Sequence, residues 1–242
     1  MHTPRRKRIK YVMRIKKIIV PILAAVILSV PFLAATVKKI SAANSLTVFK
    51  RVVIDAGHGG ADGGAVGVKT GAIEAEINLA IAKFLKAEFE NNGYTVIMTR
   101  VDNNGLYGDE SDGFKLRDLK KRVEIINSAK PEAVISVHIN KYSLSSRRGA
   151  QVFFKPGSKG SEFLARSVQN SLNLMPTAKR TYRELSGDYY ILRESNYPAI
   201  IAECGFLSNP DEEVMLQDET YQKALAAAIY GGANAYIEYV NA

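Results

Sequence analysis

The stretch RVVIDAGHGGADGG (residues 51–64) decides the fold of this chain. It begins with the apolar, β-branched run Val52-Val53-Ile54, which predicts a short buried strand. A glycine-rich turn that carries His58 follows at once. Open α/β sheets place their chemistry at the carboxyl ends of strands, so a histidine at this position indicates function rather than packing.

Two later runs have the same form. Residues 133–138 (AVISVH) end in His138, and residues 199–203 (AIIAE) end in Glu203. Because the carboxyl ends of parallel strands meet at one edge of a sheet, these side chains are expected to lie together. The pattern predicts one site assembled from His58, His138 and Glu203.

Strands and helices alternate over residues 51–242. Apolar residues at helical spacing predict helices at residues 74–92, 115–128, 161–174, 211–216 and 220–239. Further strands are expected at residues 94–99, 151–154 and 189–192, and loops at residues 101–113 and 176–188. This alternation predicts an α/β fold: a single three-layer domain with a mostly parallel central sheet flanked by helices.

The N-terminal segment has a different composition. Eight basic residues between positions 5 and 17 precede an uncharged, mostly apolar stretch at residues 18–37. Twenty such residues can cross a bilayer, and basic residues ahead of them favour a cytoplasmic N-terminus. Ser41-Ala42-Ala43 offers the small residues that a signal peptidase accepts. We therefore expect an exported protein, with a signal peptide or signal anchor at residues 1–43, a linker at residues 44–50 and a catalytic domain at residues 51–242.

The net charge of +9 does not indicate a nucleic-acid partner. Residues 1–39 contain ten of the 33 basic residues and no acidic one, so the rest of the chain is close to neutral. The single cysteine, Cys204, excludes an internal disulfide. It lies in a buried strand, where a small residue is more typical of the core than of a nucleophile.

His58 and His138 are the only histidines after the N-terminal segment. Two imidazoles, one carboxylate and an open fourth position are the ligand set of a hydrolytic zinc site. The third ligand is expected to be Glu74 or Glu76, and Gly71 favours Glu74 because it lets the chain fold back just ahead of it. Glu203 is then placed to take a proton from water and pass it to a leaving nitrogen.

Other acidic residues near these positions are expected to support the site rather than to bind metal. Asp62 and Glu76 are typical of capping or supporting groups. Asp55 is a candidate to orient an imidazole through its second nitrogen. The glycine turn could also bind an anion, but it lacks the Lys-Ser/Thr pair of a phosphate-binding loop.

Five motifs in order connect these residues to a known family. They are IDAGHGGADGGAVG (54–67), GAIEAEINLAIA (71–82), MTR (98–100), VISVHIN (134–140) and IIAECGFLSNPDEE (200–213). With them the chain resembles the zinc-dependent N-acetylmuramoyl-L-alanine amidases of family 3. The resemblance implies one Zn²⁺ per chain on His58, Glu74 and His138, a catalytic Glu203, and peptidoglycan as the substrate. Asn140 and Arg193 are candidates for substrate binding, Arg193 for a carboxylate of the peptide stem.

Within that family, the stretch GFKLRDLKKRVEIIN (113–127), the single catalytic domain and the short N-terminal segment are similar to the germination-specific cortex amidases. That similarity implies removal of stem peptides from spore cortex, the first step of muramic-δ-lactam formation, in the space between the forespore membranes. It leaves open a partner protein that regulates or activates the enzyme, and a membrane contact if the N-terminal segment is retained.

Three other functions fit parts of the pattern. A vegetative cell-wall amidase would use the same site, and a zinc peptidase would cut between amino acids of the stem. A non-catalytic peptidoglycan-binding scaffold on the same fold is the third. The presence of both histidines and both glutamates argues against the scaffold.

Overall fold

The two central strands, β3 (Ala133–Asn140) and β6 (Ala199–Phe206), carry two of the expected site residues. All eight residues of β6 and the first five of β3 are buried. A strand covered on both faces needs apolar side chains on both, which explains the continuous apolar runs. The two strands pair in parallel, and His138 lies opposite Glu203. Sheet pairing alone therefore brings these two side chains to neighbouring positions.

The computed structural model describes residues 50–242. The expected signal or anchor segment (residues 1–43), and all of the expected linker except Lys50, lie outside the described residues. Among the described residues, no helix has both the length and the apolar character needed to span a bilayer.

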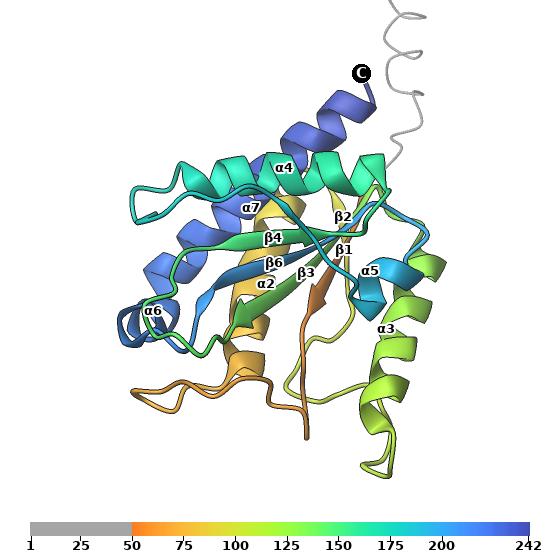
Figure 1. Cartoon of the computed structure of the whole chain (residues 1–242). Coiled ribbons are helices and arrows are strands. Elements are labelled where there is room, and N and C mark those ends of the chain that lie inside the picture. Colours follow the sequence, from red (N-terminus) through yellow and green to blue (C-terminus); the bar gives the residue numbers. More distant parts are fainter. Residues whose placement is uncertain (1–49) are drawn as a thin grey trace, which may run out of the picture. The chain divides into compact units, whose positions relative to one another are not determined.

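The sheet has six strands in the order β2-β1-β3-β6-β4-β5 (Figure 1). The other four strands are β1 (Arg51–Ala56), β2 (Thr95–Met98), β4 (Gln151–Phe154) and β5 (Leu185–Ser186). Every neighbouring pair is parallel except β4 with β6, which is antiparallel. The expected mostly parallel α/β sheet is confirmed.

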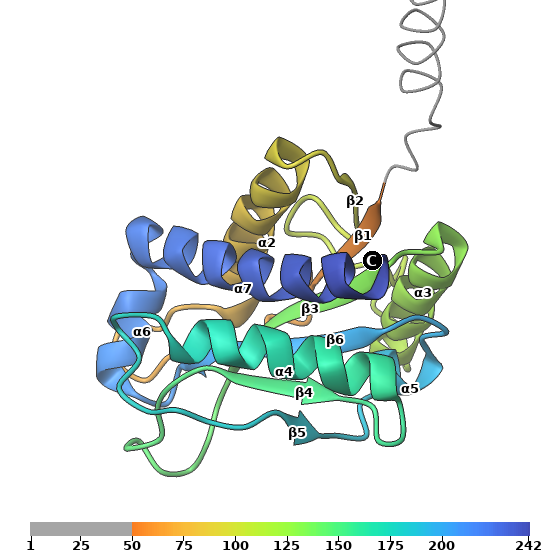
Figure 2. The ribbon, with the colours of Figure 1, turned by 90° about the horizontal axis from the view of Figure 1, so that it is seen from above.

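Helices cover both faces of this sheet (Figures 1 and 2). One face packs against α2 (Glu74–Asn91), α4 (Lys159–Asn173) and α7 (Glu219–Val240), and encloses the larger core. The other face packs against α3 (Phe114–Ala129) and α5 (Tyr190–Glu194) over a smaller core. These three layers leave the carboxyl edge of the sheet free for the loops that follow β1, β3 and β6.

A short helix, α6 (Pro210–Leu216), lies directly after β6. Asn209 caps it by accepting hydrogen bonds from the backbone N–H groups of Asp211 and Glu212, both at 3.1 Å. Pro210 takes the first helical position, where its missing N–H has no helical partner to lose. The residues NPDEE (209–213) therefore specify the start of α6 shortly after the end of β6.

The strand expected at residues 189–192 is wrong, because this segment forms the helix α5 (Tyr190–Glu194). Ile191 and Leu192 are adjacent in sequence and both are buried in the core beneath α3. In a strand, neighbouring side chains point to opposite faces, so a helical turn is needed to bury both on one side. The sheet position beside β4 is taken instead by β5, two residues inside the segment expected to be a loop.

Candidate metal centre

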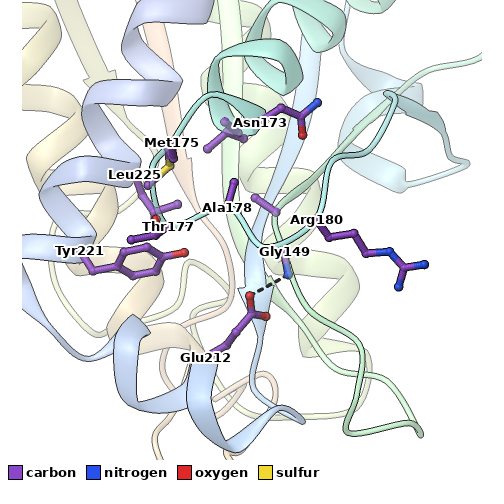
Figure 3. Close-up of a pocket in the computed structure, with 11 residues that line it drawn as sticks. Gly149, Asn173, Met175, Thr177, Ala178, Arg180, Glu212, Tyr221 and Leu225 are labelled. Carbon is purple, nitrogen blue, oxygen red and sulfur yellow. Dashed lines mark hydrogen bonds between the residues drawn. The ribbon is translucent and has the colours of Figure 1, made fainter.

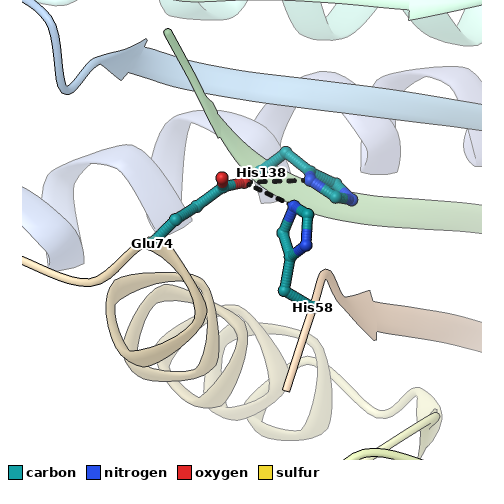
Figure 4. A group of neighbouring side chains, drawn as sticks. All are labelled: His58, Glu74 and His138. Carbon is teal, nitrogen blue, oxygen red and sulfur yellow. Dashed lines mark hydrogen bonds and ion pairs between the residues drawn. The ribbon is translucent and has the colours of Figure 1, made fainter. Parts of the chain in front are cut away.

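His58, Glu74 and His138 meet at the carboxyl edge of the sheet (Figure 4). They come from the turn after β1, the first turn of α2 and the end of β3. The Glu74 Oε1 atom lies 3.0 Å from His138 Nδ1 and 3.2 Å from His58 Nε2. One ligand atom from each residue falls within 4.8 Å of the others, so this cluster could hold a metal ion.

The His58 ring is oriented by Asp62. Its Nδ1 atom lies 2.8 Å from Asp62 Oδ2, which leaves Nε2 facing Glu74. The His58 backbone has a φ of 62°, a left-handed conformation that few non-glycine residues adopt. Such a conformation persists only where the surroundings hold it in place.

Asp55 does not take the role expected of it. Its buried carboxylate accepts hydrogen bonds from Thr99 Oγ1 at 2.6 Å, from Ser136 Oγ and from Arg122 NH1 at 2.7 Å. Burial opposes ionisation, but the Arg122 charge and the hydroxyl donors lower the pKa of Asp55 to about 2. Asp55 therefore pairs with Arg122, and the carboxylate that lies beside the His58 imidazole is that of Asp62.

Two buried arginines fix the backbone of the turn that carries His58. Arg122 donates to the carbonyl oxygens of Ala56 at 2.7 Å and of His58 at 2.6 Å. Arg100 donates to the carbonyl oxygens of Ala56 at 2.8 Å and of Gly57 at 3.0 Å. Three successive carbonyl groups are thus bound by guanidinium groups, which accounts for how the left-handed His58 is held.

Sequence reasoning missed the role of these arginines, although a signal exists for one of them. Arg122 lies three residues after Leu119 and four before Ile126, so it falls on the core-facing side of its helix. A charged residue at a core position needs a buried partner, and an acidic residue at the end of a buried strand, such as Asp55, can supply one.

Replacing Arg122 by methionine should lower the free energy of unfolding by about 3–5 kcal/mol, because the buried Asp55 carboxylate would lose its charged partner. Urea unfolding of the purified protein measures this change. Lys121, the preceding residue on α3, is exposed, and its one ion pair among the described residues is with Glu124 at 2.8 Å. Lys121→Met should change the free energy of unfolding by less than about 0.5 kcal/mol. Equal losses in the two variants would contradict the assigned role of Arg122.

Gly57 makes room for the His138 ring. A Cβ atom at Gly57 would lie 2.2 Å from both Cε1 and Nε2 of His138, far too close for atoms that are not bonded to each other. The glycine is therefore needed for the imidazole to take its place beside Glu74.

Gly57→Ala should displace His138 and so weaken metal binding. Loss of a group that merely supports a ligand costs roughly 10- to 100-fold in metal affinity, and we expect at least that loss here. Competition with a chromophoric chelator measures the affinity. Gly231→Ala in α7 is the matched control, because the added methyl would meet its nearest neighbour at 3.5 Å. Unchanged metal affinity in Gly57→Ala would show that His138 does not bind the metal from this position.

The loop before α2 is held by a glutamate from α6. The Glu213 carboxylate accepts hydrogen bonds from the backbone N–H of Lys69 at 2.6 Å and of Thr70 at 2.7 Å. At the other end of the loop, the N–H of Ala65 donates to Glu74 Oε2 at 2.7 Å. Glu74 is buried in this arrangement, whereas Glu76 is exposed to solvent. The structure thus brings Glu74, and not Glu76, to the two histidines.

The cluster is electrostatically suited to a cation. Burial by itself would lower the pKa of His58, but hydrogen bonds to Asp62 and Glu74 outweigh it and raise that pKa to about 9. Burial likewise opposes ionisation of Glu74, but its hydrogen bonds with His138 and His58 hold the pKa of Glu74 well below its usual range. The carboxylates of Asp62 and Glu74 therefore stabilise positive charge beside the imidazoles, and the same negative potential would attract a divalent cation.

Glu203 lies beside the cluster with one oxygen unused. The residue is 8 % exposed, and its Oε2 atom makes no hydrogen bond to any described residue. Burial raises the pKa of Glu203 to about 7. A buried carboxylate with a free oxygen and a pKa near neutrality has the properties of a general base.

Cys204, the next residue on β6, is fully buried, and burial raises the pKa of its thiol, so Cys204 packs in the core as expected.

Asn140 and Arg193 are not part of the cluster. Asn140 ends β3, and its carbonyl oxygen accepts a hydrogen bond from Leu207 N at 2.9 Å. Arg193 lies in α5 rather than near a strand end, and its guanidinium pairs with Asp188 at 2.7 Å and Glu194 at 3.0 Å. Substrate binding by either residue stays a prediction.

Away from the cluster, a small pocket lies between the end of α4, the loop after it and the start of α7 (Figure 3). Its volume of about 20 Å³ is room for about one water molecule. The Glu212 carboxylate beside it accepts hydrogen bonds from Gly149 N at 2.7 Å and Phe206 N at 2.9 Å, and burial raises its pKa. Glu212 therefore links the backbone of Gly149 to that of Phe206 beside this pocket.

Comparison with known proteins identifies the family of this chain. The family model of N-acetylmuramoyl-L-alanine amidases (Amidase_3) matches residues 52–235. The chain therefore belongs to this family of hydrolases, which act on peptidoglycan.

Two curated relatives define its neighbourhood within the family. The germination-specific N-acetylmuramoyl-L-alanine amidase of Bacillus subtilis is 35% identical over 192 residues, which cover 77% of this chain and 79% of the relative. The probable cell wall amidase LytH of Staphylococcus saprophyticus is 34% identical over 190 residues, covering 77% of this chain and 58% of that longer protein.

A solved structure shows the same fold. The CwlD amidase of Clostridioides difficile, determined in complex with the GerS lipoprotein, superposes with a TM-score of 0.75. It is 37% identical in sequence, and the match covers 78% of this chain and 99% of that one.

Proposed function

We propose that this protein uses a zinc ion to hydrolyse the amide between N-acetylmuramic acid and L-alanine in peptidoglycan. The observation that carries the proposal is the cluster of His58, Glu74 and His138 with the buried Glu203 opposite His138. Two imidazoles and one carboxylate suit zinc, and three protein ligands leave a position open for chemistry. When bound, zinc supplies a Lewis acid that polarises a carbonyl oxygen and acidifies water.

The remaining chemistry falls to Glu203. Water adds to the carbonyl carbon of the lactyl group, and Glu203 takes the proton that the water gives up. The carbon–nitrogen bond then breaks, and Glu203 returns the proton to the nitrogen of L-alanine. The products are a muramic acid with a free lactyl carboxylate and a stem peptide with a free amino group. No described residue donates a hydrogen bond to the buried Oε2 atom of Glu203, so the carboxylate is not committed to another partner there.

We further propose that the substrate is spore cortex, where removal of stem peptides begins muramic-δ-lactam formation. The 35% identity to a germination-specific amidase over most of both chains supports this role. A role as a vegetative cell-wall amidase is the second candidate, and the 34% identity to the probable cell wall amidase LytH supports it. The retained ligands and base make a non-catalytic scaffold the weakest of the three functions.

Location and partners follow from the same proposal. Residues 1–43 act as a signal peptide or signal anchor, so the catalytic domain works outside the cytoplasmic membrane, between the forespore membranes in a sporulating cell. A retained segment would hold the enzyme on the membrane. Because a relative of the same fold was solved with a lipoprotein, a lipoprotein is also the kind of partner to seek for this enzyme.

One paired measurement tests the proposal. The zinc content of the purified protein is determined, and the protein is then incubated with peptidoglycan of spore-cortex type and of vegetative type. Mass spectrometry should find one zinc per chain and peptide-free muramic acid, with cortex digested faster. Cuts between stem amino acids would instead indicate a peptidase, and binding without product would indicate the scaffold.

A further inference from the structure

A pocket of about 240 Å³ opens beside the metal cluster, between the turn after β1 and the helices α3 and α5. His58 and His138 form one wall of it, and Leu119 and Ile191 form an apolar wall. A group held in this pocket therefore lies directly against two of the three proposed metal ligands.

Lys115 is the pocket's available cation. Two basic residues line the pocket among the described part of the chain, Lys115 and Arg122. The Arg122 guanidinium is buried and donates to Asp55, Asp118 and two backbone carbonyl groups. The Lys115 side chain is 63% exposed, and within residues 50–242 its ammonium contacts Asp62 alone, at 2.8 Å. Since an ammonium group has three donors, two remain for a ligand.

Asp62 fixes where this ammonium stands. One oxygen of Asp62 accepts from Lys115, and the other lies 2.8 Å from Nδ1 of His58. A single carboxylate thus separates the lysine from a proposed metal ligand.

We propose that Lys115 binds the α-carboxylate of the second stem residue, the D-glutamyl residue that follows L-alanine. This inference rests on the proposed amidase function and names what determines its specificity. In the substrate this carboxylate is the anionic group nearest the scissile nitrogen on the leaving side. An amide at the same position carries no charge for the ammonium to bind, so Lys115 favours stems whose second residue is not amidated.

The experiment compares two muropeptides that differ only at this group, one with a free α-carboxylate and one with it amidated. We expect the wild-type protein to prefer the free carboxylate about tenfold in kcat/KM, as a charge-assisted hydrogen bond provides. Lys115→Gln should remove this preference through a higher KM for the free carboxylate, with the amidated substrate unchanged within about twofold. Lys115→Arg should keep the preference. Lys120→Gln, an exposed lysine on the same helix, should behave as wild type.

Metal content and product binding separate the possible outcomes. Equal losses with both substrates, together with lower metal content, would show that Lys115 only supports Asp62 and His58, and would overturn the proposal. Lack of preference in the wild type would overturn it as well. Binding of the released stem peptides, measured by calorimetry with metal-loaded protein, tests the same discrimination without turnover. Wild-type protein that discriminates the peptides but releases none would reject the amidase function while keeping the carboxylate site.

Discussion

Glu203→Gln should keep one metal ion per chain and lower kcat by about 1,000-fold, within the range that general acid–base catalysis provides. Glutamine has the same size and shape as glutamate on β6, the strand between β3 and β4, but its amide neither accepts nor returns a proton. Because Glu203 is not in the metal cluster, its replacement should leave the three ligands in place. Metal analysis and steady-state kinetics on one preparation measure both quantities.

The pH profile gives an independent signature of the same residue. Burial raises the pKa of Glu203 to about 7, and a base works only when it is deprotonated, so kcat/KM should fall as the pH drops through that region. A bound cation nearby lowers the pKa of a carboxyl group, which places the acid limb at or below pH 7. Glu203→Gln should abolish this limb. Glu76→Gln, an exposed glutamate on α2, should retain both the limb and the rate; a loss there equal to that in Glu203→Gln would refute the assignment.

His138→Ala should abolish metal binding and, with it, turnover. His138 is one of the three proposed ligands, so its loss should weaken metal affinity by more than the roughly 100-fold that removal of an outer-shell partner costs. Zinc content after dialysis against a weak chelator measures the effect, and circular dichroism verifies that the domain is folded.

Asn140→Ala is the matched control, because Asn140 lies two residues further along the same strand. It should retain the metal, and if Asn140 binds substrate, only KM should rise. Full metal content in His138→Ala would refute the proposed ligand set. Loss of metal in both variants would mean that the end of β3, rather than the imidazole, had been disturbed.

The sequence predicts the site well where strands determine it. His58, His138 and Glu203 end apolar runs, and parallel pairing necessarily brings the ends of such runs to one edge. Glu74 could be preferred to Glu76 because a glycine precedes it, and the structure places Glu74 in the cluster. The mostly parallel sheet follows from the same alternation of apolar runs and helical periods.

What the sequence did not predict depends on contacts between distant loops. Both Asp55 and Asp62 lie close to His58 in the sequence, and only Asp62 contacts its ring. This contact depends on the left-handed backbone of His58, which the residue types alone do not reveal. The hydrogen bonds from Arg100 and Arg122 to the same turn likewise join three segments. The helix α5 was mistaken for a strand because bulky β-formers there are buried by packing on α3, a tertiary effect that overrides propensity.

The strand order β2-β1-β3-β6 also sets when the protein becomes able to take up metal as it folds. His58 and Glu74 lie only 16 residues apart in the sequence, but His138 joins them only after β3 has paired with β1, and Glu203 only after β6 has paired with β3. Pairings between such distant segments are slow to form because a long loop must be closed first. Uptake of the proposed metal is therefore expected late in folding, and the rate of metal uptake by refolding protein should report completion of the central sheet.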